Sequence, residues 1–192
     1  METIATGKRI TLCKPTLELC DQVLEAVVES KAELAKYLPW VEFALTEQST
    51  KDNMLEAIEN YENFREELRI AIIERSTGRF LGMTGLIICD KSIPHFEIGY
   101  WLRTSEVGKG YIAEAVRLVE SYAFKELDAQ RVQIRAVKSN TKSIAVAKRC
   151  GFVFEAQLKH TRRLPDGELD DTIVYRKLIH EYREQNESNS DR

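Results

Sequence analysis

The chain has 192 residues, of which 43% are hydrophobic and 31% charged, and its formal net charge at pH 7 is −3. This composition excludes collagen-like, low-complexity and intrinsically disordered proteins, and the length fits one domain. Nucleic-acid binding needs a concentrated positive face, and 28 Lys and Arg against 31 Asp and Glu give no basic excess, so we expect no nucleic-acid partner.

One strand and one helix are predicted before a break in the pattern. Residues 8–13 form a short strand that stops before Pro15, since proline cannot donate a hydrogen bond to a sheet. Thr16 can cap a helix whose apolar residues recur at helical spacing over residues 17–28. The segment Tyr37-Leu38-Pro39-Trp40 ends this pattern, because a residue before proline avoids helical torsions.

A second helix is followed by three antiparallel strands. Ser49 and Asp52 form a capping-box pattern at the start of the helix, which then carries apolar residues on one face. Residues 69–74 and 80–89 flank a Ser-Thr-Gly-Arg turn and are predicted to form a hairpin. The next strand, residues 95–103, alternates strictly, and its two faces carry Phe96, Ile98, Tyr100 and Leu102 on one side and Glu97, Gly99, Trp101 and Arg103 on the other.

The next segments alternate between helix and strand. Residues 110–127 have a helical period, and residues 131–137 alternate as a strand. Asn140 can cap a short helix, and Gly151 suits the left-handed position that follows a helix end. These elements predict one helix, one strand and one further helix.

A hairpin and a polar tail end the chain. The hairpin, residues 152–163 and 169–178, turns at a Leu-Pro-Asp-Gly sequence. Residues 184–192 carry no apolar side chain, which predicts a disordered tail after a single domain of residues 1–183. The element order predicts an α/β fold of α+β character, with a central twisted sheet of about seven strands, mixed but mostly antiparallel, flanked by helices.

Cysteine and histidine spacing argues against a metal site. No C-x-x-C pair occurs among Cys13, Cys20, Cys89 and Cys150, so we expect no metal and four reduced thiols. The N-terminal residues lack the pattern of a signal peptide, and the longest mostly apolar segment is too short to span a bilayer. The sequence therefore predicts a cytoplasmic protein without a membrane partner.

The segment Glu106-Val107-Gly108-Lys109-Gly110-Tyr111 lies between a strand and a helix and is a candidate anion site. Backbone N–H groups at a helix start lack intrahelical partners, and the helix dipole favours a negative charge there. Glycines allow the backbone to approach a phosphate closely. The segment lacks the G-K-[ST] ending of a nucleoside-triphosphate loop and the three glycines of a dinucleotide fingerprint. An ordinary tight turn is the alternative.

Three segments, HFEIGYWLR, EVGKGYIAEA and VKSNTKSIAVAKRCGF, closely resemble the GNAT superfamily of acetyl-CoA-dependent N-acetyltransferases. The E-I-G-Y-W strand, the N-x-x-S element before a G-F pair and the hairpin PDGELDDTIVYRKL look like its RimJ/RimL branch, which includes acetylases of ribosomal-protein N-termini. The resemblance covers nearly the whole chain in the right order. It implies a single GNAT-type domain.

The resemblance also implies where acetyl-CoA binds. The family turn Q/R-x-x-G-x-G/A, whose amides hold the pyrophosphate, matches Val107, Gly108, Lys109, Gly110, Tyr111 and Ile112. Val107 departs from Gln/Arg and Ile112 from Gly/Ala, which we expect to alter packing more than affinity. The main chain around Trp101, Leu102 and Arg103 would pair with the pantetheine arm, and one N–H would stabilise the oxyanion. Trp101 and Arg103 side chains would line the opening, with ordinary packing as the alternative for Trp101.

Two side chains are candidates for the proton transfers. Ser143, in the N-x-x-S element with Asn140, would lie near the thioester sulfur by family analogy and could protonate the CoA thiolate. Helix capping is the alternative role for Asn140, and bonding to the first-turn backbone is the alternative for Ser143. Glu97 could take the proton of the attacking amine, or could be an exposed or salt-bridged strand residue.

The acceptor side is indicated by aromatic and basic residues. Tyr37 and Trp40 resemble the segment that walls the acceptor pocket, although Trp40 could also anchor the helix break. The basic cluster of residues 159–163 faces acidic residues across the hairpin turn, at Asp166, Glu168, Asp170 and Asp171. Cross-strand pairing explains most of this cluster, and binding of an acidic acceptor is the alternative.

The expected reaction is acetyl transfer from acetyl-CoA to a primary amine, most simply the N-terminal α-amine of a ribosomal protein, by direct attack in a ternary complex. Cys150, at a helix end, is expected to be a buried structural thiol and not an acyl carrier. A small amine such as a polyamine, drug or amino-acid derivative is the alternative acceptor. Two alternatives to an acetyltransferase are a non-catalytic acyl-CoA-binding module and a nucleotide-binding enzyme. The resemblance is compatible with a monomer or a homodimer.

Overall fold

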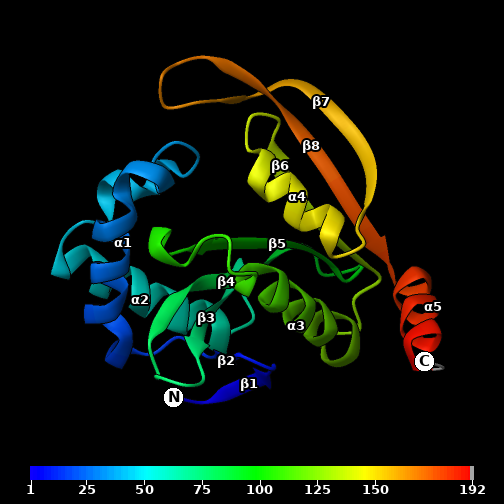
Figure 1. Ribbon diagram of the computed structural model, residues 1–192, viewed down its shortest axis with the longest axis horizontal. Helices are drawn as coiled ribbons and strands as arrows, with labels where there is room; N and C mark the ends of the chain where they lie inside the picture. Colours follow the sequence, from blue (N-terminus) through cyan, green and yellow to red (C-terminus); the bar gives the residue numbers. More distant parts are fainter. Residues whose placement is uncertain (191–192) are drawn as a thin grey trace.

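The computed structural model describes residues 1–190 and contains one mixed sheet with helices on both faces (Figure 1). In chain order the elements are β1 (Thr3–Thr6), β2 (Ile10–Cys13), η1 (Leu17–Leu19), α1 (Cys20–Leu34), η2 (Pro39–Phe43), α2 (Glu47–Glu62), β3 (Glu67–Glu74), β4 (Phe80–Asp90), β5 (His95–Leu102), η3 (Thr104–Glu106), α3 (Tyr111–Glu126), β6 (Arg131–Val137), α4 (Thr141–Arg149), β7 (Val153–Arg163), β8 (Leu169–Leu178) and α5 (Ile179–Ser190). None of the described helices is long and apolar enough to cross a membrane.

The sheet is mixed and mostly antiparallel, as the sequence predicted. Its described strands follow the order β1-β2-β3-β4-β5-β6-β8-β7, and only β5 and β6 run parallel. The sheet has eight strands and not seven, because β1 pairs with β2 at the edge. Four residues with a half-exposed pattern, Thr3–Thr6, gave too short an alternation to be recognised as a strand.

Side-chain alternation along the strands builds a separate core on each face. On β3, Leu68, Ile70 and Ile72 join the core under α3 and α4, whereas Ala71 and Ile73 join the core under α1 and α2. Because successive strand residues point to opposite faces, one strand serves both layers. The sheet is therefore the middle layer of a three-layer domain.

The central feature of the sheet is a split between β5 and β6. These strands pair only at His95↔Arg131, Phe96↔Val132 and Glu97↔Gln133. Beyond these pairs β5 continues to pair with β4 as far as Leu102, and β6 continues to pair with β8 as far as Val137. The second half of β5 therefore has a strand partner on one side only.

Two helix boundaries differ from the sequence prediction. Helix α2 begins earlier, because Thr46 takes extended torsions and its Oγ1 accepts from the Ser49 N–H at 3.1 Å, forming the capping box. Thr16 caps η1, which leads into α1.

The C-terminal end also differs, since α5 runs through residues 184–190 of the predicted disordered tail. Tyr182 anchors this helix by stacking on Phe124 at 4.6 Å between ring centroids. Residues 191–192 of the predicted tail lie outside the described residues.

Candidate functional site

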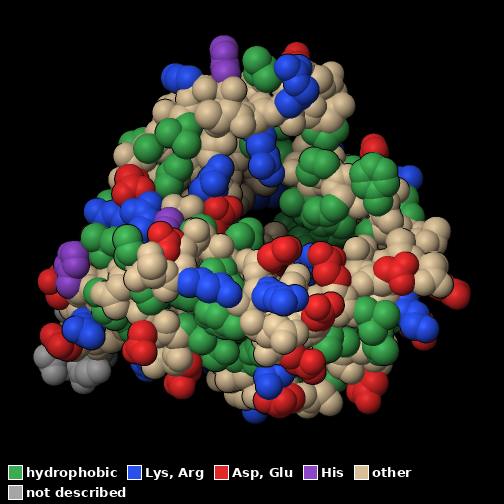
Figure 2. Space-filling view, turned by 180° about the vertical axis from the view of Figure 1, so that it is seen from behind, with side chains coloured by type: hydrophobic (Ala, Val, Ile, Leu, Met, Phe, Trp, Pro, Cys, Tyr) green, Lys and Arg blue, Asp and Glu red, His purple; other side chains and the backbone are tan. Residues whose placement is uncertain are grey.

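A cavity of about 610 Å³ lies where β5 and β6 part. Its walls come from the second half of both strands, the start of α4, the α1–α2 face of the sheet and the β7–β8 hairpin. Figure 2 shows a deep hollow in the surface, with apolar side chains inside and charged side chains on its rim. Segments that are distant in sequence thus enclose one space.

The turn before α3 exposes a run of backbone donors. Gly108 and Gly110 have φ of +88° and +85°, torsions that residues with a Cβ resist. Gly110 is the N-cap of α3 and provides no side-chain cap. Within the described part of the chain, the N–H groups of residues 108–113 make no hydrogen bond. Such a run at a helix start is suited to a phosphate.

An ion-pair network fixes the position of this turn. Arg9 donates to the Lys109 carbonyl at 2.8 Å and to the Glu114 carboxylate at 2.9 Å, and it lies over the Tyr111 ring. The Tyr111 hydroxyl donates to Glu74 at 2.7 Å, and Lys109 Nζ donates to Glu106 at 2.8 Å. Lys109 and Tyr111 therefore use their side chains within the protein, which leaves their main chain for a ligand.

The two departures from the family turn have different surroundings. Val107 is exposed, and Ile112 packs against the core on the α3 side of the sheet. The Ile112 side chain thus fills space in the protein interior.

Strand β5 presents its unpaired edge to the cavity. Gly99, Tyr100 and Trp101 line the cavity, and Leu102 is buried. Trp101 lies between Trp40 and Phe80, with ring centroids at 5.9 and 5.8 Å. The Trp101 ring thus forms an aromatic wall together with the segment after α1.

The expectation for the Arg103 side chain is corrected by the structure. Arg103 is only 1% exposed and does not line the cavity. Its guanidinium donates to the Phe80 carbonyl at 2.9 Å and to Glu25 and Glu29 of α1 at 2.9 and 2.8 Å. Carboxylates one turn apart on α1 hold this side chain under the helix. The alternation of residues 95–103 predicted the face of the sheet on which the Arg103 side chain lies, but it could not show that α1 covers that face.

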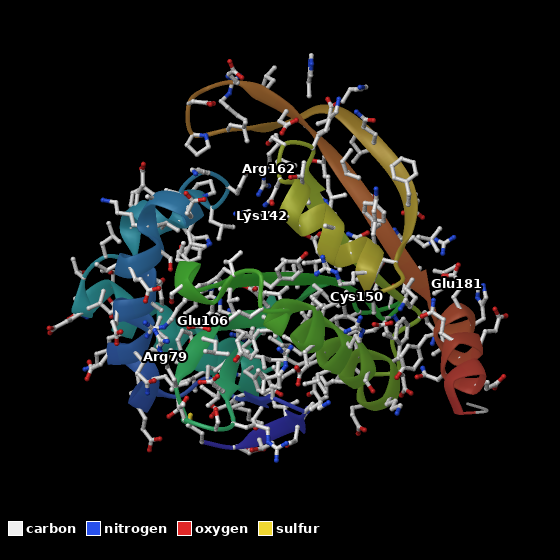
Figure 3. All side chains as sticks on the ribbon, viewed as in Figure 1. Arg79, Glu106, Lys142, Cys150, Arg162 and Glu181 are labelled. Atoms are coloured by element: carbon white, nitrogen blue, oxygen red, sulfur yellow. The ribbon has the colours of Figure 1, made fainter. Side chains whose placement is uncertain are left out.

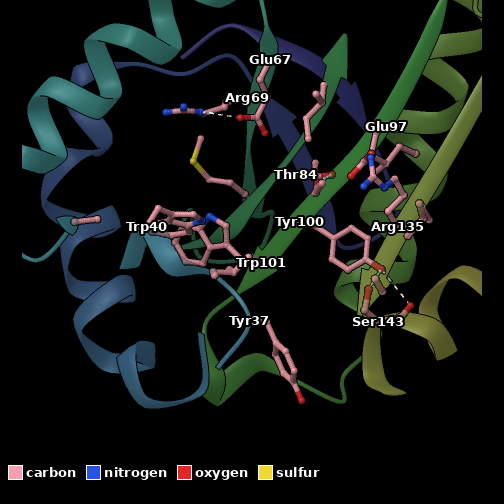
Figure 4. Close-up of a pocket in the computed structure, with 18 of the residues that line it drawn as sticks. Tyr37, Trp40, Glu67, Arg69, Thr84, Glu97, Tyr100, Trp101, Arg135 and Ser143 are labelled. Carbon is pink, nitrogen blue, oxygen red and sulfur yellow. Dashed lines mark hydrogen bonds and ion pairs between the residues drawn. The ribbon is translucent and has the colours of Figure 1, made fainter. Parts of the chain in front are cut away.

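Glu97 points into the cavity from β5 (Figure 4). Its carboxylate accepts from Gln133 Nε2 at 3.2 Å and lies 3.6 Å from Arg135 Nη1. Burial raises the pKa of Glu97, against the opposing effect of the Arg135 charge. Glu67, two strands away on the same face, is held by Arg69 at 3.1 Å and its charge raises the pKa of Glu97 further. A carboxylate with a raised pKa in a cavity is suited to accept a proton.

Asn140 and Ser143 lie at the start of α4, on the other side of the opening. Asn140 Oδ1 accepts from the Ser143 N–H at 3.1 Å, which is the predicted helix cap. Ser143 Oγ lies 2.8 Å from the Tyr100 hydroxyl. Both Asn140 and Ser143 line the cavity. Asn140 therefore caps α4 and also belongs to the wall of the site.

Tyr100 was missed by the sequence interpretation. Alternation placed it correctly with the core residues of β5, but its hydroxyl extends to α4 and donates to the Ser143 carbonyl at 3.2 Å or shares a bond with Ser143 Oγ. Burial raises the pKa of Tyr100 to about 12, so the phenol stays protonated at neutral pH. A tyrosine among apolar strand residues gave no signal, because the contact depends on how β5 and α4 approach each other.

Some of the residues expected on the acceptor side line the cavity, and others pair within the hairpin. Tyr37 and Trp40 line the cavity, as does Arg162 of the cluster at residues 159–163. Lys159 pairs with Asp171 at 3.0 Å, which agrees with cross-strand pairing. Among residues 1–190, no group of three or more His, Cys, Asp and Glu side chains is placed to hold a metal ion.

Comparisons with known proteins agree with this geometry. A family model described as an acetyltransferase (GNAT) domain matches residues 9–153. The N-acetyltransferase p20 of Bacillus licheniformis, itself uncharacterized, is 30% identical over 182 residues, which cover 95% of this chain and 99% of the relative. The ribosomal-protein-serine acetyltransferase of Escherichia coli (strain K12) is 25% identical over 186 residues, covering 93% and 97% of the two chains. The structure of the microcin C7 self immunity acetyltransferase MccE, in complex with acetyl-CoA and AMP, has a TM-score of 0.82 at 26% identity and covers 90% of this chain and 94% of MccE.

Proposed function

The chain belongs to the acetyltransferase (GNAT) family and is an acetyl-CoA-dependent N-acetyltransferase. On this premise we propose that its acceptor is the N-terminal α-amine of a protein, which attacks the thioester of acetyl-CoA directly. The resemblance of its motifs to this family is confirmed. The observation that carries the proposal is the cavity between β5 and β6, which brings the free amides of β5, a carboxylate and a hydroxyl to one space.

The chain's backbone would hold acetyl-CoA, which supplies the acetyl group as a thioester. The free N–H groups of residues 108–113 would bind the pyrophosphate, and the unpaired edge of β5 from Gly99 to Leu102 would bind the pantetheine arm. The main chain of Arg103, expected to take part, does not, because its N–H donates to the Leu81 carbonyl at 2.8 Å and its carbonyl accepts from Glu106 at 3.0 Å. An N–H on this edge would also stabilise the negative oxygen that forms when the amine attacks. Both sites use main-chain groups, so they tolerate the side-chain departures at Val107 and Ile112.

Glu97 would take the proton that the attacking amine loses. An α-amine, whose pKa is about 7.7–8.0, needs only a modest base, whereas a lysine amine near 10.4 needs a stronger one. Gln133 orients the Glu97 carboxylate by donating to Oε2. This matching favours an α-amine as the acceptor.

Ser143 would donate a proton to the departing CoA thiolate, and Tyr100 would replace it. The hydrogen bond between the two hydroxyls, 2.8 Å long, provides the path. The phenol of Tyr100 is protonated at neutral pH and can pass its proton to Ser143. Tyr100 would then take a proton from water in the cavity, while Glu97 releases the proton of the amine to water. Ser143 and Tyr100 therefore act as one unit in this proposal.

Direct transfer is supported by the positions of the thiols. No described residue that lines the cavity is a cysteine. Cys150 is buried, its Sγ donates to the Ala113 carbonyl at 3.5 Å, and burial raises the pKa of its thiol. A buried thiol of raised pKa is a poor nucleophile.

The acceptor wall and the relatives support a protein N-terminus. Tyr37, Trp40 and Trp101 provide aromatic surface that could pack against the first residues of a peptide. The relative from Escherichia coli is named for acetylating serine of a ribosomal protein. Ribosomal proteins are accordingly the first acceptors to test.

The experiment is to follow free thiol from acetyl-CoA in the presence of N-terminal peptides of ribosomal proteins, polyamines and amino-acid derivatives. We expect thiol release above the hydrolysis background with peptides, and much less with small amines. Release with small amines alone would contradict the acceptor class. Tight acetyl-CoA binding without release for any amine would instead indicate a non-catalytic binding module.

A further inference from the structure

One wall of the cavity carries an arginine that the proposed reaction does not use. Arg162 lies on the β7–β8 hairpin and lines the cavity together with Thr172 of the neighbouring strand. Figure 3 shows Arg162 on the concave side of the arch that this hairpin forms over the opening. The hairpin therefore contributes a cationic side chain to the wall of the cavity.

A bulge in the hairpin sets the direction of Arg162. The pairing of β7 with β8 shifts between Leu158 and Arg162, and His160 within this interval has φ of +50°. A bulge turns the strand locally and changes where the following side chains point. Regular pairing resumes at Arg162↔Asp170. After the bulge, Arg162 lines the cavity, whereas the other residues of the basic cluster at 159–163 do not.

The carboxylates of the hairpin are bound by other groups. Asp171 accepts from Lys159 at 3.0 Å, and Asp170 accepts from the Ser139 hydroxyl at 2.7 Å. Arg163 donates to the Gly167 carbonyl at 2.7 Å. Within residues 1–187, whose side chains are described, Arg162 forms no hydrogen bond or ion pair. The charge of Arg162 acts on Glu97 across the cavity and lowers the pKa of that carboxyl. The guanidinium donors of Arg162 have no hydrogen-bond partner among the described side chains, so the fork can bind a carboxylate.

The cavity is charged in a way that fits an acceptor with separated charges. On one side Glu67 and Glu97 line it, each with an arginine of its own, Arg69 at 3.1 Å and Arg135 at 3.6 Å. Arg162 lines it from the hairpin as a further positive charge without an ion pair among the described side chains. We propose that Arg162 binds a carboxylate one or two residues after the acetylated amine, so that the enzyme selects acidic N-termini. This inference rests on the proposed function and specifies its acceptor class.

The test uses matched peptides that differ at one position. Peptides with Ser-Asp, Ser-Asn and Ser-Lys at the N-terminus, and a second set with the same changes at position three, are compared by kcat/KM for thiol release. For the wild-type enzyme we expect a preference of about tenfold or more for aspartate over asparagine, because a charge-assisted hydrogen bond contributes about that much. Arg162→Gln should abolish this preference, so that the ratio of kcat/KM for aspartate to asparagine peptides falls to about one. Because the Arg162 charge lowers the pKa of Glu97, the variant also shifts the acidic limb for both peptides, and the ratio at one pH is therefore the readout.

Two further variants make the result specific to Arg162. Arg163→Gln removes a neighbouring positive charge that does not line the cavity, and it should keep the preference for aspartate. Arg162→Glu should invert the order and favour the lysine peptides, which loss of folding cannot produce. Equal kcat/KM for aspartate and asparagine peptides with the wild-type enzyme would overturn the inference, as would a preference that survives Arg162→Gln. Neither result would affect the proposed function, which fails if no peptide releases thiol or if the acetyl group is found on a lysine side chain and not on the α-amine.

Discussion

Glu97 lies on β5 and Ser143 at the start of α4, on the two sides of the opening in the sheet, and each has a separate proton to move. Glu97 must be ionised to act as a base, and burial raises its pKa above the ordinary value. The wild-type kcat/KM should therefore fall with decreasing pH at a higher pH than an ordinary carboxyl would give.

Glu97→Gln should lower kcat/KM most at low pH, by about 10²-fold, because the acceptor amine is then protonated and has no base. As the pH rises towards the pKa of the amine, about 8, the amine ionises unaided and much of the rate should return. A pH-rate profile between pH 5 and 9 measures both limbs. An acidic limb identical to that of the wild type would exclude Glu97 as the base.

Ser143→Ala should lower kcat by about 10²-fold or less and leave the affinity for acetyl-CoA nearly unchanged, since water can replace part of the proton donor's role. Tyr100→Phe should have a similar effect through the shared hydrogen bond. Residues that act as one unit are not additive, so the double variant should be no slower than the slower single variant. A double variant whose loss equals the product of the single losses would mean that the two hydroxyls act separately.

Among the elements, the turn before α3 offers a matched pair of glycine variants. Gly108 and Gly167 have φ of +88° and +90°, and a Cβ at either would meet nothing within 4 Å. Alanine at each position should cost about 1–2 kcal/mol of unfolding free energy, since both need left-handed torsions. Only Gly108→Ala should weaken acetyl-CoA binding, by about tenfold, because the Cβ and the strain fall on the proposed pyrophosphate site. Titration calorimetry separates the two, and equal affinities would place the pyrophosphate elsewhere.

A buried ion pair joins α3 to β8. Lys177 Nζ lies 2.5 Å from Glu120 Oε1, the two side chains are 3% and 4% exposed, and burial raises the pKa of Glu120. Lys177→Met should reduce the free energy of unfolding by about 3–5 kcal/mol, because it leaves a carboxylate buried without its partner. The double variant Lys177→Met, Glu120→Leu should recover most of this loss. Urea denaturation measures both, and a single variant as stable as the wild type would contradict the role of the pair.

Local patterns predicted most elements, and the failures have physical causes. The strand at 95–103 and the cap at Asn140 depend on alternation and side-chain chemistry within a few residues, and both are confirmed. The edge strand Thr3–Thr6 is too short for a clear period, and α5 is held by the stacking of Tyr182 on Phe124. Both β1 and α5 depend on interactions with distant segments, which a local sequence pattern cannot predict.

The same distinction applies to the site. The turn at residues 106–111 was singled out because its two glycines lie where a helix start leaves backbone N–H groups unpaired, and because the neighbouring segments resemble the same family. The burial of Arg103 under α1 and the bond between Tyr100 and Ser143 depend on tertiary packing. Arg162 differs from its basic neighbours only through a bulge in β7. Sequence therefore indicated the glycine turn from local chemistry, whereas the surroundings of Tyr100, Arg103 and Arg162 depend on the fold.

Across the whole molecule, the split in the sheet is what turns the fold into a site. Three residue pairs hold β5 against β6, and beyond them two halves of the sheet diverge around a cavity of about 610 Å³. One half provides the free edge of β5 and Glu97, and the other provides Ser143 and the hairpin with Arg162. The proposed transfer to an N-terminal amine depends on both halves.

The measurement that tests this account most directly is the location of the acetyl group on a peptide that offers two amines. A ribosomal-protein N-terminal peptide with a free α-amine and one internal lysine is incubated with the enzyme and acetyl-CoA, and fragmentation mass spectrometry identifies the modified nitrogen. We predict a single acetyl group on the α-amine, with equimolar release of CoA thiol. Acetylation of the lysine side chain, or of neither amine while a small amine is acetylated, would contradict the account.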